Sequence, residues 1–305
     1  METEKTLVVL CGPTCTGKTA ASLELAERIG AEIVAADSRT VYRLMDIGTA
    51  KPTPAQRAWV PHHLLDVAAP DEIFTVAHFR HLARSAIDDI QNRGKIPLLV
   101  GGTGLYIRAV TDDLQIPKAP PNWELRARLE KAERAEPGSL HRRLTVVDPA
   151  AAARIHPRNI RRLVRAIEVF ETTGTPISSQ QRRGDTAFEA ARVGLQVERP
   201  VLYQRIDVRV DEQIAAGLVD EVRGLLASGY GPSLPSMQGL GYKEILAFLN
   251  GEHTMEEAVA MLKRNTRRYA KRQLTWFRPD PRIRWIDVTN LTPTEVAATM
   301  ASMLE

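Results

Sequence analysis

The first hundred residues alternate between short apolar runs and segments with helical spacing. Three runs of mostly apolar residues predict strands that are buried on both faces: residues 6–11, 32–36 and 96–100. Residues 18–29 and 76–92 place apolar side chains at helical spacing and predict helices. Such strands, alternating with helices, are typical of a parallel sheet with helices on both faces. The fold class expected is therefore α/β.

The pattern changes near residue 115. Three helical patterns follow a proline-rich linker, with no strand pattern among them: residues 123–135, 139–147 and 159–173. We predict a mainly helical insertion domain over residues 115–195, and a core domain formed by residues 1–114 and 196–305. Polar residues 178–189 predict a loop, and residues 192–197 a strand that returns to the sheet. The remaining elements expected are helices near 202–228, 242–250 and 255–276, a strand over 283–287 and a helix from Thr292.

Composition narrows the class of protein. With 305 residues, 44% hydrophobic and 26% charged, the chain suits a folded protein of about two domains. It has no apolar run of about 18 residues and no signal-peptide layout, so we expect a cytoplasmic protein with no membrane partner. Cys11 and Cys15 predict neither a disulfide framework nor a zinc site, and the histidines predict no metal site. Because the net charge is only +4, nucleic-acid binding would need local basic clusters.

Residues 12–19 match the phosphate-binding pattern G-x-x-x-x-G-K-[ST], between a predicted strand and a predicted helix. Glycines let backbone N–H groups turn toward a phosphate, and the helix amino terminus adds positive partial charge. The lysine supplies a cation, and the final threonine hydroxyl can hold Mg²⁺. The predicted phosphate-binding residues are Gly12, Pro13, Thr14, Cys15, Thr16, Gly17, Lys18 and Thr19, with Thr19 as the metal-binding residue.

An acidic residue is expected near such a loop, but the strand at 96–100 is followed by three glycines and Thr103. Asp37, at the end of the second predicted strand, is the nearest candidate. Because the carboxyl ends of parallel strands meet at the ligand crevice, we expect the phosphate loop, Asp37 and Thr103 to face one site. The alternative is that Asp37 caps a helix in the segment that follows it.

Two basic clusters stand out against the low net charge. Residues 263–284 hold nine Lys or Arg against one acid, Asp280, with Tyr269, Trp276 and Phe277 among them. This density predicts phosphate contacts with aromatic planes for stacking, although a charge run is also typical of a solvated helix face. The second cluster consists of Arg154, Arg158, Arg161, Arg162 and Arg165. Two clusters suit an RNA stem-loop gripped from two sides, and because one chain supplies both, we expect a monomer.

Eight segments together resemble the bacterial tRNA dimethylallyltransferases, also named isopentenyl-diphosphate:tRNA transferases. They follow the family's order and spacing over nearly the whole chain: residues 12–19, 36–42, 46–52, 62–67, 98–106, 161–174, 239–244 and 267–278. Nucleotide kinases share only the first segment. The resemblance implies transfer of a dimethylallyl group from dimethylallyl diphosphate to N6 of adenosine 37, in tRNAs that read codons beginning with U. Diphosphate is released, with Mg²⁺ as the cofactor.

The same resemblance implies residue roles. Asp37 would accept the N6 proton, Thr14 and Thr103 would orient the substrates, and Lys18 and Arg209 would bind the diphosphate. The residues it places against tRNA are Asp37, Ser38, Arg39, Thr40, Thr103, Arg161, Arg162, Leu163, Arg165, Gln238, Gly239, Gly241, Tyr242, Lys271, Arg272 and Arg278. Thr40 stands where the family usually has an amide side chain, which bears on one base-edge hydrogen bond rather than on the chemistry. We expect the anticodon stem-loop to present a flipped adenine through a channel opposite the prenyl donor.

Three alternatives remain at this point. The phosphate loop could belong to an ATP-dependent kinase, or to a nucleotide-switched RNA-binding protein. Read without the resemblance, Arg205 and Arg209 could instead pair with Asp207 or Asp211 on a solvated helix.

Overall fold

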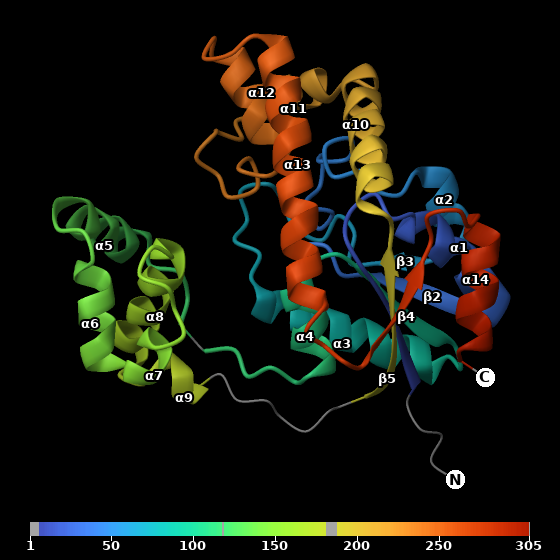
Figure 1. Ribbon diagram of the computed structural model, residues 1–305, viewed down its shortest axis with the longest axis horizontal. Helices are drawn as coiled ribbons and strands as arrows, with labels where there is room; N and C mark the ends of the chain where they lie inside the picture. Colours follow the sequence, from blue (N-terminus) through green and yellow to red (C-terminus); the bar gives the residue numbers. More distant parts are fainter. Residues whose placement is uncertain (1–5, 118, 181–187, 305) are drawn as a thin grey trace. The chain divides into compact units, whose positions relative to one another are not determined.

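The computed structural model describes residues 6–117, 119–180 and 188–304. The chain forms two compact units (Figure 1). We name Met1–Thr111 with Phe188–Glu305 the core unit, and Asp112–Ala187 the insertion unit. Within the described ranges, no helix combines the length and the apolar character needed to cross a membrane.

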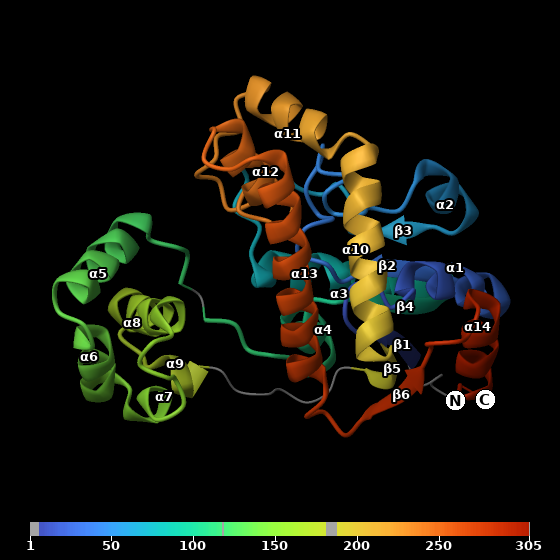
Figure 2. The same cartoon turned by 45° about the horizontal axis from the view of Figure 1, so that its top comes forward.

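A six-stranded parallel sheet forms the centre of the core unit (Figures 1 and 2). In spatial order its strands are β3 His62–His63, β2 Ala31–Ala35, β4 Ile96–Gly101, β1 Thr6–Cys11, β5 Glu189–Gln196 and β6 Ile283–Asp287. Every pairing is parallel, which confirms the predicted fold class. Because β5 pairs with β1 and β6, it belongs to the core unit, and the insertion boundary predicted at residue 195 is wrong.

Helices cover both faces of this sheet: α1 Lys18–Ile29 and α14 Pro293–Ser302 on one, α3 Val76–Asn92 and α4 Gly104–Thr111 on the other (Figure 2). Along β1, Val8 and Leu10 pack in the hydrophobic cluster of α1 and α14. Leu7 and Val9 pack in the cluster of α3 and α4. Since strand side chains alternate between faces, a continuous apolar run is what a doubly covered strand requires.

The remaining helices of the core unit are α2 Pro54–Trp59, α10 Arg199–Ala215, α11 Leu218–Ala227, α12 Tyr242–Leu249 and α13 Met255–Phe277. The last four share a third hydrophobic cluster that includes Val210, Leu218 and Leu262. The single helix predicted over residues 202–228 is in fact two helices. Gly217 has a φ of 98°, a left-handed conformation that ends one helix before the next begins.

The insertion unit is helical, as its sequence predicts: α5 Trp123–Ala135, α6 Ser139–Val147, α7 Pro149–Ala152, α8 Ile160–Thr173 and α9 Ile177–Gln180. Its apolar core includes Leu129, Leu140 and Leu144. Three acids of this unit are buried, Asp112, Asp148 and Glu168, and Glu168 has no exposed surface. Residues 181–187 of the predicted loop lie outside the described residues.

Candidate active site

The loop between β1 and α1 has the turns of a phosphate loop. Gly12 has a φ of 138°, and a Cβ at this position would lie 2.5 Å from the carbonyl oxygen of Leu195. Cys15 and Gly17 also have positive φ, of 63° and 85°. No side chain in the described part of the chain caps the amino terminus of α1. Its first N–H groups are therefore available to an anion.

Two cations lie at this loop. Lys18 Nζ donates to the carbonyl oxygen of Pro13 at 2.6 Å, and Arg209 Nη1 on α10 donates to Thr14 Oγ1 at 3.2 Å. Burial, with the positive charge of Arg209 as the next cause, lowers the pKa of the Lys18 ammonium from 10.5 to about 8, while Cys15 and Asp37 oppose the shift. Two like charges that form no ion pair with the described residues favour a bound anion.

The solvated-helix alternative for Arg209 is wrong. The two acids it invokes have other partners: Asp207 binds Arg267, and Asp211 binds Lys263 at 2.6 Å. Arg205 donates to the carbonyl oxygen of Thr289 at 3.0 Å instead.

Asp37 and Thr103 meet at the carboxyl ends of β2 and β4, as the strand-end rule predicts. Ser38 N donates to Thr103 Oγ1 at 3.1 Å, and Arg39 N donates to Asp37 Oδ1 at 2.8 Å. The helix-cap alternative for Asp37 is wrong, because the hydrogen bond closes a turn and the next helix, α2, begins only at Pro54. Asp37 Oδ2 accepts no hydrogen bond from the described residues, whereas Oδ1 accepts the one from Arg39 N.

A residue that sequence reasoning misses joins the two halves of the site. Gln273 on α13 accepts a hydrogen bond from Thr14 N at 2.9 Å and donates one to the carbonyl oxygen of Gly102, also at 2.9 Å. It is 5% exposed. Tyr269, one helical turn earlier, lies beside Thr103 and Asp37, and burial raises its pKa, with the negative charge of Asp37 as the next cause. The only available signal is that Ala270, Gln273 and Phe277 share the inward face of α13.

The segment after Asp37 lies against residues 235–241. Arg39 Nη1 donates to the carbonyl oxygen of Pro235 at 2.9 Å, and its side chain also approaches Gly239. Gln238 is exposed, with its Nε2 donating to the carbonyl oxygen of Pro232 at 2.8 Å. Thr40 is buried, and its Oγ1 has no hydrogen-bond partner among the described residues. Two of the predicted RNA-contacting segments are thus adjacent.

Burial contradicts a tRNA contact by two of the predicted side chains. Tyr242 is 1% exposed, packs on Gly48 and donates to Glu221 Oε1 at 2.7 Å. Leu163 is fully buried in the apolar core of the insertion unit. Gly241, the residue before Tyr242, is also buried and has a φ of 90°, so that it shapes the start of α12. These residues support the fold near the predicted contacts.

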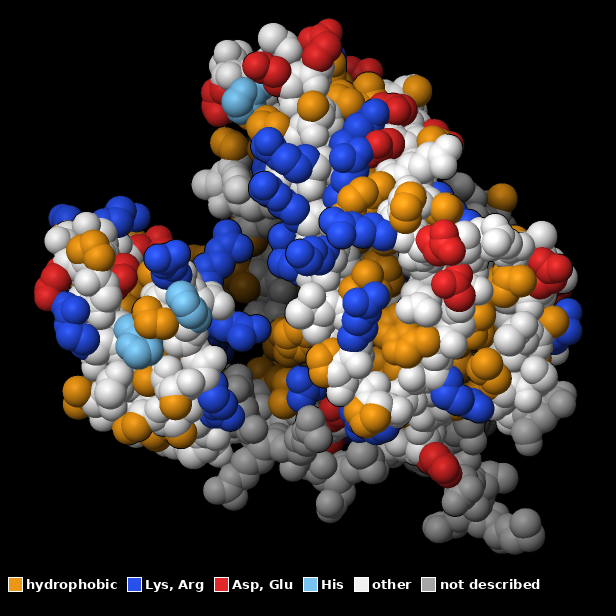
Figure 3. Space-filling view, viewed as in Figure 1, with side chains coloured by type: hydrophobic (Ala, Val, Ile, Leu, Met, Phe, Trp, Pro, Cys, Tyr) orange, Lys and Arg blue, Asp and Glu red, His pale blue; other side chains and the backbone are white. Residues whose placement is uncertain are grey.

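The basic clusters divide into paired and unpaired side chains. Figure 3 shows Lys and Arg side chains gathered over α13 and α10. On and just after α13, five of these residues are exposed and form no ion pair with the described residues: Arg264, Arg268, Lys271, Arg272 and Arg278. In the insertion unit, Arg161 and Arg162 are likewise exposed and unpaired. Arg165, of the same basic cluster, is paired instead: its guanidinium donates to Glu168 at 2.6 Å and to the carbonyl oxygen of Ala119 at 3.0 Å.

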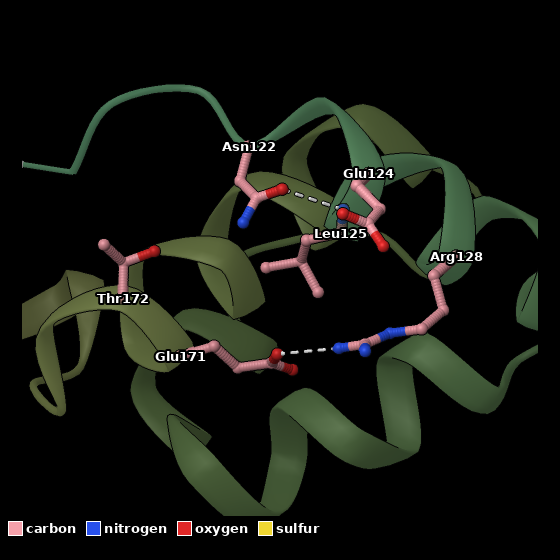
Figure 4. A pocket seen from close by; sticks show the side chains of 6 residues that line it. All are labelled: Asn122, Glu124, Leu125, Arg128, Glu171 and Thr172. Atoms are coloured by element: carbon pink, nitrogen blue, oxygen red, sulfur yellow. Dashed lines mark hydrogen bonds and ion pairs between the residues drawn. The ribbon is translucent and has the colours of Figure 1, made fainter.

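A pocket of about 360 Å³ in the insertion unit holds none of the predicted site residues. Its lining residues are Asn122, Glu124, Leu125, Arg128, Glu171 and Thr172 (Figure 4). Its polar groups already bind one another, since Arg128 pairs with Glu171 at 3.3 Å and Asn122 caps α5 through Leu125 N. The pocket therefore has few free polar groups for a ligand.

The order of the parallel strands and the turns of the phosphate loop define a P-loop type of fold. The IPP transferase family model matches residues 40–280. The tRNA dimethylallyltransferase of Symbiobacterium thermophilum is 52% identical over 286 residues, 93% of this chain and 89% of the relative. That of Desulforudis audaxviator is 55% identical over 285 residues, 92% of each chain. The chain belongs to the IPP transferase family, which confirms the resemblance seen in the sequence.

Solved structures agree with this assignment. The tRNA isopentenylpyrophosphate transferase of Bacillus halodurans is 42% identical with a TM-score of 0.74, and the match covers 99% of this chain and 97% of that one. A eukaryotic dimethylallyltransferase, described as acting on tRNA, is 29% identical with a TM-score of 0.81, covering 98% of this chain and 78% of that one.

Proposed function

We propose that this protein is a tRNA prenyltransferase that moves a dimethylallyl group from dimethylallyl diphosphate to N6 of adenosine 37 and releases diphosphate. The observation that carries the proposal is the junction of two half-sites. Lys18, Arg209 and Thr14 surround the phosphate loop, and Asp37 and Thr103 lie at the adjoining strand ends. A donor with two phosphates fits the first half, and an amine that must lose a proton fits the second.

The reaction balances with these groups alone. The N6 lone pair forms a bond to C1 of the dimethylallyl group while the bond from C1 to the diphosphate oxygen breaks, and its electron pair leaves with diphosphate. Lys18 and Arg209 stabilise the charge that develops on the leaving group. Asp37 Oδ2 accepts the N6 proton, because exocyclic amines are weak nucleophiles until that proton departs. Thr103 Oγ1 accepts a hydrogen bond from Ser38 N, the residue after Asp37, so the hydroxyl lies near Asp37 and would orient the amine there.

Mg²⁺ fits this site as a phosphate-bound ion. Among the described residues no group of three His, Cys, Asp or Glu side chains can hold a metal, and Thr19 offers one hydroxyl in the first turn of α1. An ion held by Thr19 would take its other ligands from the diphosphate and water, which is the usual arrangement for Mg²⁺. It would supply further neutralisation of the leaving group.

The exposed cations support a tRNA substrate held by its phosphates. Lys271, Arg272 and Arg278 in the core unit, and Arg161 and Arg162 in the insertion unit, are free to bind an anticodon stem-loop. Adenosine 37 is stacked in that loop, so it would have to flip out to reach Asp37. Since one chain carries every group invoked, the proposed active unit is a monomer. The cytoplasm is the proposed location, because it is where a tRNA-modifying enzyme meets its substrate.

The test is a direct assay. The protein, Mg²⁺ and dimethylallyl diphosphate are incubated with an unmodified anticodon stem-loop, and the RNA is examined by mass spectrometry for the gain of one dimethylallyl group. A matched RNA with guanosine at position 37 is the control and should gain nothing. Hydrolysis of ATP or GTP without prenylation would instead support the kinase or the nucleotide switch.

A further inference from the structure

The amide of Gln273 is the single side-chain group that binds both the phosphate loop and the loop before Thr103 among the hydrogen bonds of the described residues. Its Oε1 accepts from Thr14 N and its Nε2 donates to the carbonyl oxygen of Gly102. Both bonds are 2.9 Å long, and the residue is 5% exposed. Water therefore competes weakly for either bond.

The surroundings are shaped around this amide. A Cβ on Gly102 would lie 2.1 Å from Gln273 Nε2 and 3.4 Å from the carbonyl oxygen of Gly12, so only glycine leaves room for the bond. A side chain that bridges Thr14 N and the carbonyl oxygen of Gly102 needs one acceptor and one donor on the same planar group. Glutamine provides both at this reach, whereas methionine of similar shape provides neither.

The two loops that Gln273 joins carry the two halves of the proposed site. Thr14 also accepts from Arg209 at 3.2 Å, so the orientation of its backbone bears on the cation that faces the diphosphate. Gly102 precedes Thr103, whose hydroxyl accepts from Ser38 N beside Asp37. A shift of about 1 Å between donor and acceptor groups can cost 10²-fold in rate.

We propose that Gln273 is a positioning residue that sets the separation between the diphosphate half and the base half of the active site. This inference rests on the proposed function. Its Oε1 and Nε2 each bind a backbone group, so it would act through Thr14 and through Thr103, the residue after Gly102. Its neighbours Lys271 and Arg272 face outward on the same helix, so RNA phosphates bound there would be placed relative to the same amide.

The experiment compares Gln273→Met and Gln273→Glu with a control, Thr275→Ala. Thr275 is exposed on the same helix, and among the described residues its hydroxyl bonds only to the carbonyl oxygen of Lys271, so its replacement should leave activity unchanged. We measure kcat, KM for each substrate, thermal unfolding, and binding of inorganic diphosphate. Gln273→Met should lower kcat about 30-fold and weaken diphosphate binding about tenfold. KM for the stem-loop should stay within about threefold, because the exposed cations remain.

Gln273→Glu provides a readout that a packing role would not move. A carboxylate presents an acceptor to the Gly102 carbonyl and adds negative charge beside the diphosphate. The Glu variant should therefore lose more kcat and more diphosphate affinity than the Met variant. A protonated carboxyl restores one donor and one acceptor. The loss of kcat and diphosphate affinity relative to the parent protein should therefore become smaller as pH falls toward the pKa of the introduced glutamic acid.

Two results would overturn the inference: a Met variant with parental kcat and diphosphate affinity, or losses that follow the melting temperature with no change in the diphosphate affinity of the folded fraction. Failure of the proposed function looks different. A parent protein that binds diphosphate but prenylates no RNA would contradict the proposed reaction, while the binding comparison among the variants would still decide the role of Gln273.

Discussion

Two carboxylates, one in each unit, are held in opposite ways. In the insertion unit Glu168 is fully buried, and both of its oxygens are occupied by Arg126, Arg165 and the backbone N–H of Asn122. In the core unit Asp37 is partly exposed and, within the described part of the chain, accepts one hydrogen bond, from Arg39 N. The nearby cations Lys18 and Arg209 form no ion pair with any residue that the structure describes. Charges neutralised by one another stabilise a fold, whereas charges left unneutralised beside a loop are available to a substrate.

The largest effect should come from removing the neutralised acid. Glu168→Ala leaves Arg126 and Arg165 facing each other without an acid, and losing one partner of a buried ion pair costs about 3 kcal/mol when the arginines can reach water in part. Urea unfolding of the full chain, together with limited proteolysis between residues 112 and 187, measures the loss. Glu168→Gln, which keeps the shape and one acceptor, should lose less. A loss below about 1 kcal/mol would mean that Glu168 does not hold the insertion unit together.

Asp37→Ala should lower activity and leave stability nearly unchanged, which is the reverse of the effect expected for Glu168→Ala. Turnover should fall by about 10²-fold or more, the scale of a lost general base, while the melting temperature and the affinity for tRNA change little. Single-turnover prenylation with saturating donor measures the chemical step. Asp71→Ala, at an exposed acid outside the site, is the matched control. Near-normal turnover in the Asp37 variant would remove this carboxylate from the mechanism.

The same contrast explains how far the sequence alone can be read. The phosphate loop is one contiguous motif, and Asp37 and Thr103 follow from the rule for parallel strand ends, so all three could be found without coordinates. Gln273 could not, because its role depends on which face of α13 meets the loops. Leu163 shows the opposite error. It belongs to an RNA-binding segment by resemblance, yet apolar neighbours at helical spacing already indicate a core position.

Contacts between segments far apart in the chain also limit what the sequence alone can predict. Glu221 accepts from the backbone N–H groups of Asp46, Ile47 and Gly48 and from the hydroxyl of Tyr242, and no local pattern predicts that contact. The two-residue strand β3 is equally hidden, because His62 and His63 are not apolar and pair with β2 only in the folded sheet.

Unpaired arginines of the insertion unit provide the next test. Replacing Arg158, Arg161 and Arg162 by alanine should weaken tRNA binding about 30-fold at low salt. The slope of log affinity against log salt concentration should become less steep by about two to three, because each phosphate contact releases counterions. KM for dimethylallyl diphosphate should stay unchanged. Arg165 is left intact, since it already pairs with Glu168.

The control for that triple variant uses paired arginines of the same unit. Arg128 and Arg142 bind Glu171 and Glu136, so replacing both by alanine removes positive charge that is already neutralised. The salt slope of this double variant should match the parent slope. Equal slopes for the parent protein and the triple variant would show that Arg158, Arg161 and Arg162 do not meet RNA.

The smallest expected effect is a pH dependence of diphosphate binding. With its pKa lowered to about 8, Lys18 carries its charge at pH 7 and loses most of it by about pH 9 in the free protein. Affinity for inorganic diphosphate should therefore fall about fivefold to tenfold as pH rises over this window. Folding stability changes in the opposite direction to diphosphate affinity. As pH rises above 8, the unfolded chain still holds the proton that the folded chain has released, so the free energy of unfolding increases.

A comparison with Lys18→Arg isolates this effect. Inorganic diphosphate also ionises with pH, but it does so equally for both proteins, so the ratio of their affinities reports the lysine alone. Arginine stays charged throughout, and the ratio should shift in favour of the variant as pH passes about 8. Arg209→Ala should move the change to higher pH, because Arg209 is a cause of the lowered pKa, second only to burial. A ratio that stays constant from pH 7 to pH 9 would show that Lys18 remains charged over this range, and that its pKa is not lowered in the folded protein.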